Sequence, residues 1–202
     1  MKYLIFDFDG VLGDTLHQAR LIKAKMENKS YEQVVDEVQK QFNNTVHSKK
    51  DNPSDQKMLK ILKWTHDFSY LLSKTDFPLF TGFIEEIKKI ENTKNAIVSS
   101  GSKFYIDKVA SVGIDFTHIL DLFDHHSKEE KILQICRDWK VDIKDIYYLT
   151  DTQSDVKELI DIMDPAKIIG CSWGFQGYDK LSEVLPQNQI LKEFSDIHKV
   201  LA

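Results

Sequence analysis

The sequence predicts an α/β protein in which helices flank a parallel β-sheet and a helical segment follows the first strand. The chain opens with an apolar stretch of strand type, residues 3–6, that ends in two aspartates, Asp7 and Asp9. Residues 15 to about 73 then have helical periodicity. From residue 77 onward, short apolar runs alternate with helical stretches, which is typical of parallel sheets whose strands are joined by helices.

Length and composition favour one folded core domain with a modest second unit. The chain has 202 residues, of which 42% are hydrophobic and 29% are charged, a balance typical of folded rather than disordered proteins. No basic stretch followed by a long apolar one opens the sequence, and no apolar run approaches the ~20 residues of a membrane span. We therefore expect a cytoplasmic protein without a membrane partner.

The net charge and the cysteine content argue against further classes of protein, namely nucleic-acid-binding, disulfide-linked and zinc-binding ones. A net charge of −5 argues against nucleic acid as a partner, because proteins that bind the phosphate backbone usually carry a basic surface. Cys136 and Cys171 lack CxxC spacing, so we expect two reduced, buried thiols. His125 and His126 are expected to be a loop pair, since no third ligand follows at zinc spacing. The sequence does not predict an oligomeric state.

Three helices are expected between residues 15 and 77. The first is indicated by apolar residues at helical spacing, Ala19, Ile22 and Met26, and the second by a stripe of Tyr31, Val34, Val35, Val38 and Phe42. A break at Asn52-Pro53 and the N-cap residue Ser54 predict the third. This segment has 11 Lys and Arg against 8 Asp and Glu, a charge of +3, whereas the rest has 16 against 24, or −8. The positive charge fits attraction of phosphate esters, and ordinary solvated helix faces explain it equally well.

Strands and helices alternate in the remainder of the chain. We expect strands at residues 95–99, 116–120, 146–150 and 167–171, and helices near 82–91, 102–112, 128–139 and 154–163. The helix after Ser127 has the strongest start signal, because Ser127 and Glu130 have the spacing of a capping box.

Carboxylates follow two of the predicted strands. Asp7 and Asp9 share a face if the strand continues, unless Gly10 allows the chain to bend. Asp151 and Asp155 follow the strand at 146–150 in the same way. Because the carboxyl ends of parallel strands meet at one edge of a sheet, several negative charges are expected there, and a cation would stabilise them. As single residues, Ser154 and Asp155 also fit the role of helix cap.

A hydroxyl-rich turn and a lysine complete the set of candidate residues. The strand at 95–99 runs into Ser99-Ser100-Gly101-Ser102 where a helix is about to start, an arrangement suited to binding an anion. Taken alone, Ser100 or Ser102 fits a simple N-cap. Lys128 opens a helix although a cation there opposes the helix dipole, and Lys131 one turn later is the rival choice.

In this order, these four sites resemble the motifs of the haloacid dehalogenase-like (HAD) superfamily, phosphatase type. They are Asp7-Phe8-Asp9-Gly10-Val11-Leu12, Ala96-Ile97-Val98-Ser99, Lys128, and Asp151 with Asp155; Trp173-Gly174-Phe175 resembles a stretch of the phosphoglycolate phosphatase-like members. Two departures are that Thr150 stands where Gly or Asp usually precedes the fourth motif, and that no proline follows Lys128. The resemblance implies a Rossmann-like core of residues 1–14 and 78–202 and a helical cap of residues 15–77.

The resemblance also implies a mechanism, that of a Mg²⁺-dependent phosphatase acting on a small phosphorylated metabolite through an aspartyl-phosphate. Asp7 would be nucleophile and metal ligand. Asp9 would act as general acid and base and offer its backbone carbonyl to the metal. Asp151 and Asp155 would complete the Mg²⁺ site, Asp155 directly or through a coordinated water. The phosphoryl group would be bound by Ser99, Ser100, Gly101 and Lys128.

Other activities fit parts of the same pattern. A phosphomutase differs only in what accepts the phosphoryl group. A 2-haloacid dehalogenase shares the aspartate nucleophile, but dehalogenases of this superfamily lack the aspartate at the position of Asp9. A protein that kept the fold for binding without turnover is a third alternative. The substrate is not specified, although Trp64, His66 and His17 of the helical segment are candidate contacts, beside ordinary core or surface roles.

Overall fold

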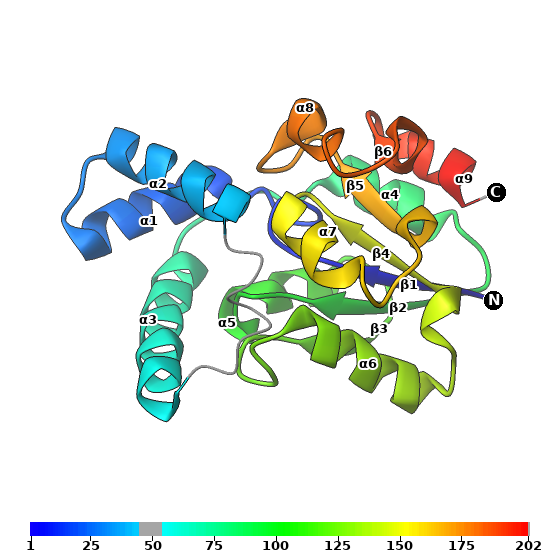
Figure 1. Ribbon diagram of the computed structural model, residues 1–202, viewed down its shortest axis with the longest axis horizontal. Coiled ribbons are helices and arrows are strands. Elements are labelled where there is room, and N and C mark those ends of the chain that lie inside the picture. Colours follow the sequence, from blue (N-terminus) through cyan, green and yellow to red (C-terminus); the bar gives the residue numbers. More distant parts are fainter. Residues whose placement is uncertain (45–53, 202) are drawn as a thin grey trace.

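The centre of the molecule is a six-stranded sheet in which every neighbouring pair of strands is parallel (Figure 1). The computed structural model describes residues 1–44 and 54–201. The strands are β1 (Lys2–Phe6), β2 (Thr93–Val98), β3 (Phe116–Leu120), β4 (Ile146–Thr150), β5 (Ile168–Cys171) and β6 (Ile190–Leu191). Their order is β3-β2-β1-β4-β5-β6, so the chain moves outward from β1 to β3 and then returns to the other side of β1. Such a reversal creates the crevice in which ligands of open α/β sheets bind.

The predicted strands are confirmed with small differences at their ends. Two of them, at 116–120 and 146–150, have the predicted bounds, whereas β2 begins at Thr93 and ends at Val98. Strand β6 was not predicted, because two residues are too few to produce an apolar pattern.

Helices cover both faces of the sheet, and the strands alternate their side chains between the two layers. On one face, Leu4 and Phe6 of β1 pack with α4 (Thr81–Lys88), α5 (Lys103–Ile106) and α9 (Ile197–Val200). On the other, Ile5 packs with α6 (Lys128–Trp139), α7 (Gln153–Leu159) and α8 (Gly177–Leu181). The helix expected at 102–112 is shorter, because α5 ends at Ile106 and continues as a 3₁₀ turn, Asp107–Ser111.

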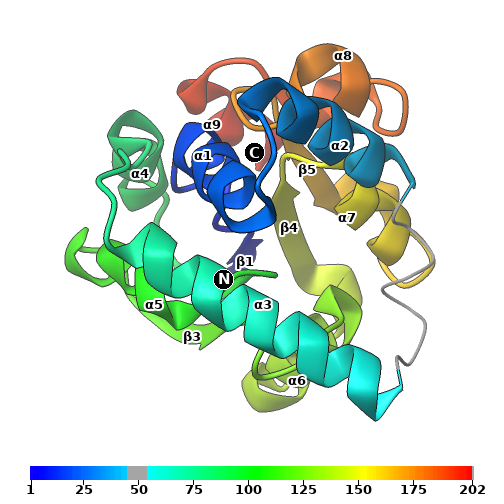
Figure 2. The same ribbon diagram turned by 90° about the vertical axis from the view of Figure 1, so that its left-hand side faces the viewer.

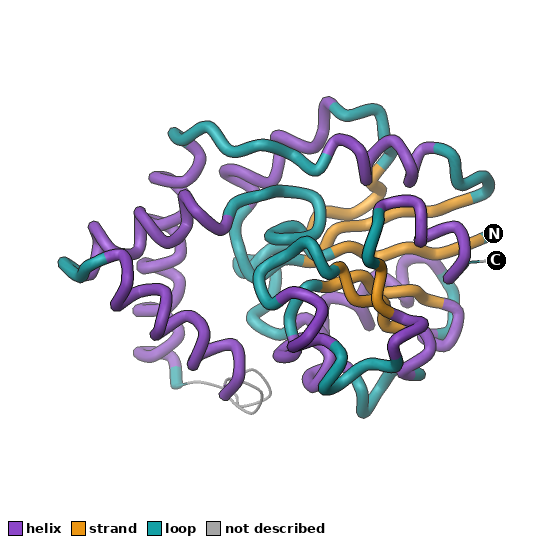
Figure 3. Tube along the Cα trace, turned by 90° about the horizontal axis from the view of Figure 1, so that it is seen from above, coloured by secondary structure: helices purple, strands orange, loops and turns teal. Residues whose placement is uncertain are grey.

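Three helices between β1 and α4 form a second layer, named here the helical insert: α1 (Leu16–Glu27), α2 (Tyr31–Asn44) and α3 (Asp55–Ser73). They lie beyond the carboxyl ends of the strands (Figures 1 and 3) and in front of the sheet when viewed along the strands (Figure 2). Ser54 caps α3 as predicted, since its hydroxyl accepts a hydrogen bond from the backbone N–H of Lys57 at 3.4 Å. No helix in the described ranges is long and apolar enough to cross a membrane.

The apolar stripe of α2 is less buried than its pattern predicts. Val34 is fully buried, but Tyr31, Val35 and Val38 are half-buried. The side chain of Phe42 and the break at residues 52 and 53 lie outside the described residues. Cys136 and Cys171 are both unpaired and buried, as predicted.

Candidate active site

The two aspartates of the first strand diverge because the chain bends at Gly10. The backbone N–H of Asp7 still continues the sheet, donating to the carbonyl of Leu149 at 2.9 Å. Gly10 then adopts a φ of +74°, and a Cβ there would lie 1.9 Å from Oδ2 of Asp151. A glycine is therefore required both by the backbone conformation and by the space that Asp151 occupies. The predicted bend brings Asp7 beside Asp151 and sends Asp9 in another direction.

Lys128 joins the two ends of this cluster. Its Nζ donates to Oδ2 of Asp7 and to Oδ2 of Asp155, both at 2.6 Å, and its side chain is only 2% exposed. Burial lowers the pKa of this lysine, but Asp155 and Asp7 raise it more, so the net pKa is well above its usual value. Lys128 is therefore a permanent cation next to Asp7.

A partner from α7 explains why a cation is tolerated at the start of α6. Glu158 accepts hydrogen bonds at Oε1 from the hydroxyl of Ser127 at 3.0 Å and from the backbone N–H of Lys128 at 2.8 Å. The negative charge of Glu158 thus interacts favourably with the positive end of the helix dipole. Ser127 caps α6 by accepting from the N–H of Glu130, but its own N–H bonds Nδ1 of His125, so the reciprocal half of the capping box is replaced.

The two candidate lysines, Lys128 and Lys131, have different partners in the structure. Nζ of Lys131 donates to the backbone carbonyls of Ser99, at 2.5 Å, and Asp121, at 3.3 Å. Lys131 thereby holds the turn after β2 against the segment after β3, whereas Lys128 reaches the carboxylates.

Thr150, the departure from the family pattern, orients Asp155. Its hydroxyl donates to Oδ2 of Asp155 at 2.7 Å, and the hydroxyl of Tyr148 donates to the same oxygen at 3.3 Å. With Lys128, three donors converge on this one oxygen. Asp155 is therefore held as the counter-ion of Lys128.

Asp151 is held on one side and lacks a hydrogen bond on the other. Oδ2 accepts from the backbone N–H of Phe175 at 2.6 Å. Oδ1 is buried and, among the described residues, has no hydrogen-bond partner. A Cβ at Gly174 would lie 2.3 Å from the Cβ of Asp151, so the second glycine of the site also makes room for this aspartate.

These carboxylates fit a hard divalent cation such as Mg²⁺. Burial raises the pKa of Asp151 well above its usual value, and the charge of Asp7 raises it further. The pKa of Asp7 is raised to about 7, mainly by burial and against the opposing effect of Lys128. In the described part of the chain no three His, Cys, Asp or Glu side chains form a complete metal cage. Mg²⁺ needs no such cage, because it commonly binds through one or two carboxylates, water and substrate phosphate.

Asp9 has two hydrogen-bond donors that sequence reasoning missed. The hydroxyl of Thr15 donates to Oδ1 at 2.6 Å, and the hydroxyl of Tyr105 donates to Oδ2 at 2.7 Å. Burial raises the pKa of Asp9, and these two hydrogen bonds partly offset it. Tyr105 reaches this position across Gly101, where a Cβ would lie 1.7 Å from the tyrosine oxygen.

The turn after β2 is only partly open to a ligand. Ser99 is fully buried, and its hydroxyl accepts from the N–H of Gly101 at 2.9 Å. Ser102 caps α5 by accepting from the N–H of Phe104. Ser100 and Gly101, in contrast, line the cavity described next.

A cavity of about 300 Å³ lies between the sheet edge and the helical insert. The sheet edge contributes acidic and basic side chains, Asp7, Asp9, Lys128, Asp151 and Asp155. The insert contributes a mainly apolar wall, Leu16, Ala19, Arg20, Lys23, Trp64 and Phe68. Of the three insert residues considered as contacts, Trp64 lines the cavity. His17 lies against Tyr31, and His66 lies against Asp67 and Phe104.

Comparison with solved structures gives the same fold over the length of the chain. A predicted phosphoglycolate phosphatase from Haemophilus somnus 129PT has a TM-score of 0.68 at 16% identity, covering 100% of this chain and 98% of that one. A haloacid dehalogenase-like family hydrolase from Streptococcus pneumoniae has a TM-score of 0.69 at 14% identity, covering 100% and 99%. A hydrolase from Pseudomonas syringae has a TM-score of 0.72 at 14% identity, covering 100% and 98%. The sequence matches no protein-family model and no curated protein. The resemblance drawn from the four motifs is confirmed at the level of architecture: the chain has the fold of the haloacid dehalogenase-like hydrolases.

Proposed function

We propose that the protein is a Mg²⁺-dependent phosphatase that hydrolyses a small phosphorylated metabolite through an aspartyl-phosphate on Asp7. The observation that carries this proposal is the position of Lys128, whose Nζ lies 2.6 Å from Oδ2 of Asp7 at the floor of the cavity. A carboxylate beside a fixed cation and a second buried carboxylate suits attack on a phosphoryl group, whose negative charge the cation stabilises.

Asp7 and Asp151 are the residues that would hold Mg²⁺, together with the backbone carbonyl of Asp9. The buried Oδ1 of Asp151, which lacks a hydrogen bond within the described residues, supports this assignment. When bound, the ion would neutralise the carboxylates and polarise the phosphoryl oxygens. Asp155, which already accepts from three donors, is better suited to act through Lys128 or through a coordinated water than as a direct ligand.

The reaction divides into two displacements. In the first, a carboxylate oxygen of Asp7 forms a bond to phosphorus while the bond to the leaving oxygen breaks, and Asp9 donates its proton to that oxygen. In the second, Asp9 takes a proton from water, and the water oxygen displaces the carboxylate of Asp7 to release phosphate. The raised pKa of Asp9 suits this dual use, because a buried carboxyl keeps its proton until the leaving group needs it. Ser99, Ser100, Gly101 and Lys128 would bind the phosphoryl oxygens.

The helical insert, residues 15–77 in the domain division that we propose, would act as a cap. Its helices lie over the carboxyl ends of the strands and supply part of the cavity wall. A cap in this place can exclude water while the phosphoryl group is transferred and then open to release product.

Phosphate release from a panel of phosphorylated metabolites, measured with Mg²⁺ and with EDTA, tests the proposal. We expect turnover that requires Mg²⁺ and is abolished in Asp7→Asn. Asp115→Asn is the matched control, since Asp115 is exposed and lies just before β3, at the opposite edge of the sheet. Turnover that survives EDTA or Asp7→Asn contradicts the proposal, as does halide release from a 2-haloacid or transfer of the phosphoryl group to a sugar phosphate. Mg²⁺ binding without turnover would instead support the non-catalytic alternative.

A further inference from the structure

We propose that the substrate is an aromatic phosphate ester that carries a second anionic group, a carboxylate or another oxyanion, which Arg20 binds. This inference rests on the proposed function, because it assigns the leaving group of the same reaction. Its basis is the half of the cavity that the helical insert supplies.

A pair of aromatic side chains from the helical insert lines the same cavity as the carboxylates of the sheet edge. The rings of Trp64 and Phe68 stack with their centroids 5.0 Å apart and an interplanar angle of 12°. Both side chains line the cavity, and Trp64 remains 37% exposed. Leu16, Ala19 and Val38 extend this surface. Such a wall favours an aromatic, apolar body, since an aromatic group gains from burial and from contact with the rings there, whereas a polyol would lose hydrogen bonds to water.

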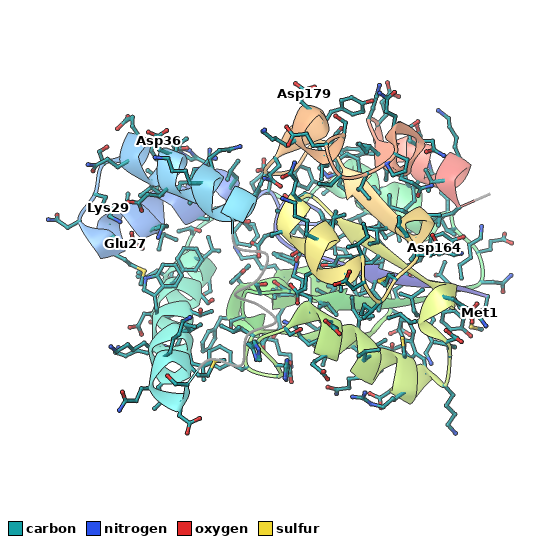
Figure 4. All side chains as sticks on the ribbon, in the orientation of Figure 1. Met1, Glu27, Lys29, Asp36, Asp164 and Asp179 are labelled. Carbon is teal, nitrogen blue, oxygen red and sulfur yellow. The ribbon has the colours of Figure 1, made fainter. Side chains whose placement is uncertain are left out.

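Three lysines of the insert are already paired with carboxylates of the insert itself. Lys29 binds Glu27 and Glu37, each at 2.8 Å, at the outer end of the insert, where Figure 4 labels Lys29 and Glu27. Lys63 binds Asp67 at 2.8 Å. Lys23 lines the cavity but pairs with Glu27 and lies 5.4 Å from the centroid of the Trp64 ring. The net charge of the insert therefore does not give the charge that a ligand in the cavity would meet.

Arg20 is different, because it lines the cavity and has no partner among the residues that the structure describes. Within residues 1–44 and 54–201, its side chain has no hydrogen bond and no ion pair, and its Nε is buried. A buried N–H that has lost water and gained no acceptor is costly. The guanidinium presents several donors in one plane, an arrangement that matches the two oxygens of a carboxylate. A ligand oxyanion in the cavity would give this guanidinium the ionic partner that it lacks among the described residues.

Together these features define the substrate. With its phosphoryl group at Asp7 and Lys128, the ester would extend its ring along Trp64 and direct its second oxyanion to Arg20. A volume of about 300 Å³ fits a compact molecule with one ring.

Two aryl esters of equal size test this inference: 4-carboxyphenyl phosphate and 4-carbamoylphenyl phosphate, which lacks the negative charge. The measured quantity is the ratio of their kcat/KM values in the wild type and in Arg20→Met. We expect the wild type to prefer the carboxylate by about tenfold or more, and this preference to be lost in Arg20→Met and partly kept in Arg20→Lys. Because the same two esters are compared in each protein, their different intrinsic reactivities cancel from the change in this ratio between the wild type and a variant.

Lys25→Met is the matched control, since Lys25 is an exposed cation on the same helix and does not line the cavity. It should keep the wild-type ratio. Thermal melting of each variant confirms that it is folded. A ratio that is unchanged between the wild type and a folded Arg20→Met or Arg20→Lys variant overturns the inference, as does better turnover of an aliphatic carboxylated phosphate ester than of the aryl one. A wild type that turns over the metabolite panel but neither aryl ester also overturns the inference. A wild type that is inactive on the panel and on all of these esters contradicts the proposed function instead, so the two failures are distinguishable.

Discussion

Replacement of Lys128 by methionine should destabilise the protein, and by an amount that depends on pH. Methionine keeps much of the length of the side chain but removes the cation that lies 2.6 Å from both Asp7 and Asp155. All three side chains are at most 8% exposed, so water cannot replace the lost partner. Removal of one member of a buried ion pair costs about 3–5 kcal/mol, and we expect a loss of this size at about pH 8.

The pH dependence follows from the direction of the pKa shift of Asp7. Its pKa is about 7 in the folded protein even with Lys128 present, against about 3.9 in an unfolded chain, and loss of the cation raises the folded value further. The folded variant thus binds a proton more tightly than the unfolded chain does. Its free energy of unfolding therefore falls as the pH rises from about 4 through this raised pKa. The gap between the wild type and Lys128→Met should be smallest near pH 5 and largest near pH 8.

Urea denaturation at the two pH values measures this gap. Lys131→Met is the matched control, because Lys131 is another fully buried lysine of α6 and donates to backbone carbonyls rather than to Asp7. It should lose stability with a weaker dependence on pH. An equal loss at both pH values in Lys128→Met would refute the electrostatic argument and assign the effect to packing.

Three further outcomes are expected. Tyr105→Phe removes a hydrogen bond that lowers the pKa of Asp9, so the limb of the pH–rate profile that reports Asp9 should move to higher pH by about one unit; an unmoved profile contradicts this role. Mg²⁺ should raise Tm more at about pH 8 than at about pH 5.5, because Asp7 must lose its proton to bind the ion, and Asp151→Asn should remove the shift; equal shifts at both pH values count against the site. Burial raises the pKa of Cys136 to about 11, so iodoacetamide at about pH 8 should label this thiol only in denaturant. The contribution of Cys136 to the free energy of unfolding should decline between about pH 9 and pH 11. Rapid labelling of Cys136 in the native protein argues against this burial.

The sequence could predict which residues meet at the sheet edge because that follows from local pattern and topology. Asp7 and Asp151 each follow an apolar strand, and parallel strands present their carboxyl ends together. The turn residue Gly10 and the helix start at Ser127 are likewise local signals. These features need only a few neighbouring residues to be recognised.

The partners of the site residues could not be predicted in this way, because they come from distant parts of the chain. Tyr105 lies 96 positions from Asp9, and Glu158 lies 30 from Lys128. No periodicity marks a tyrosine or glutamate as the partner of a particular backbone or side-chain group. Thr150 is adjacent to the motif, yet its contact with Asp155 depends on how α7 begins. The burial of Ser99 also required the structure, because the sequence does not show which hydroxyl of the turn faces the cavity.

The contact between the insert and α5 links the position of the insert to the proposed proton carrier. His66 of α3 packs edge-on against Phe104, with ring centroids 5.2 Å apart, and Phe104 is followed directly by Tyr105, which holds Asp9. A second connection joins Nζ of Lys108 to the backbone carbonyl of Thr75, just after α3, at 2.8 Å. A movement of α3 away from the sheet must either break these contacts or move α5 and the turn after it along with α3. If the insert opens as proposed, its opening would displace Tyr105 and so change the pKa of Asp9. A ligand that holds the insert closed would then also set the acidity of the group that it needs.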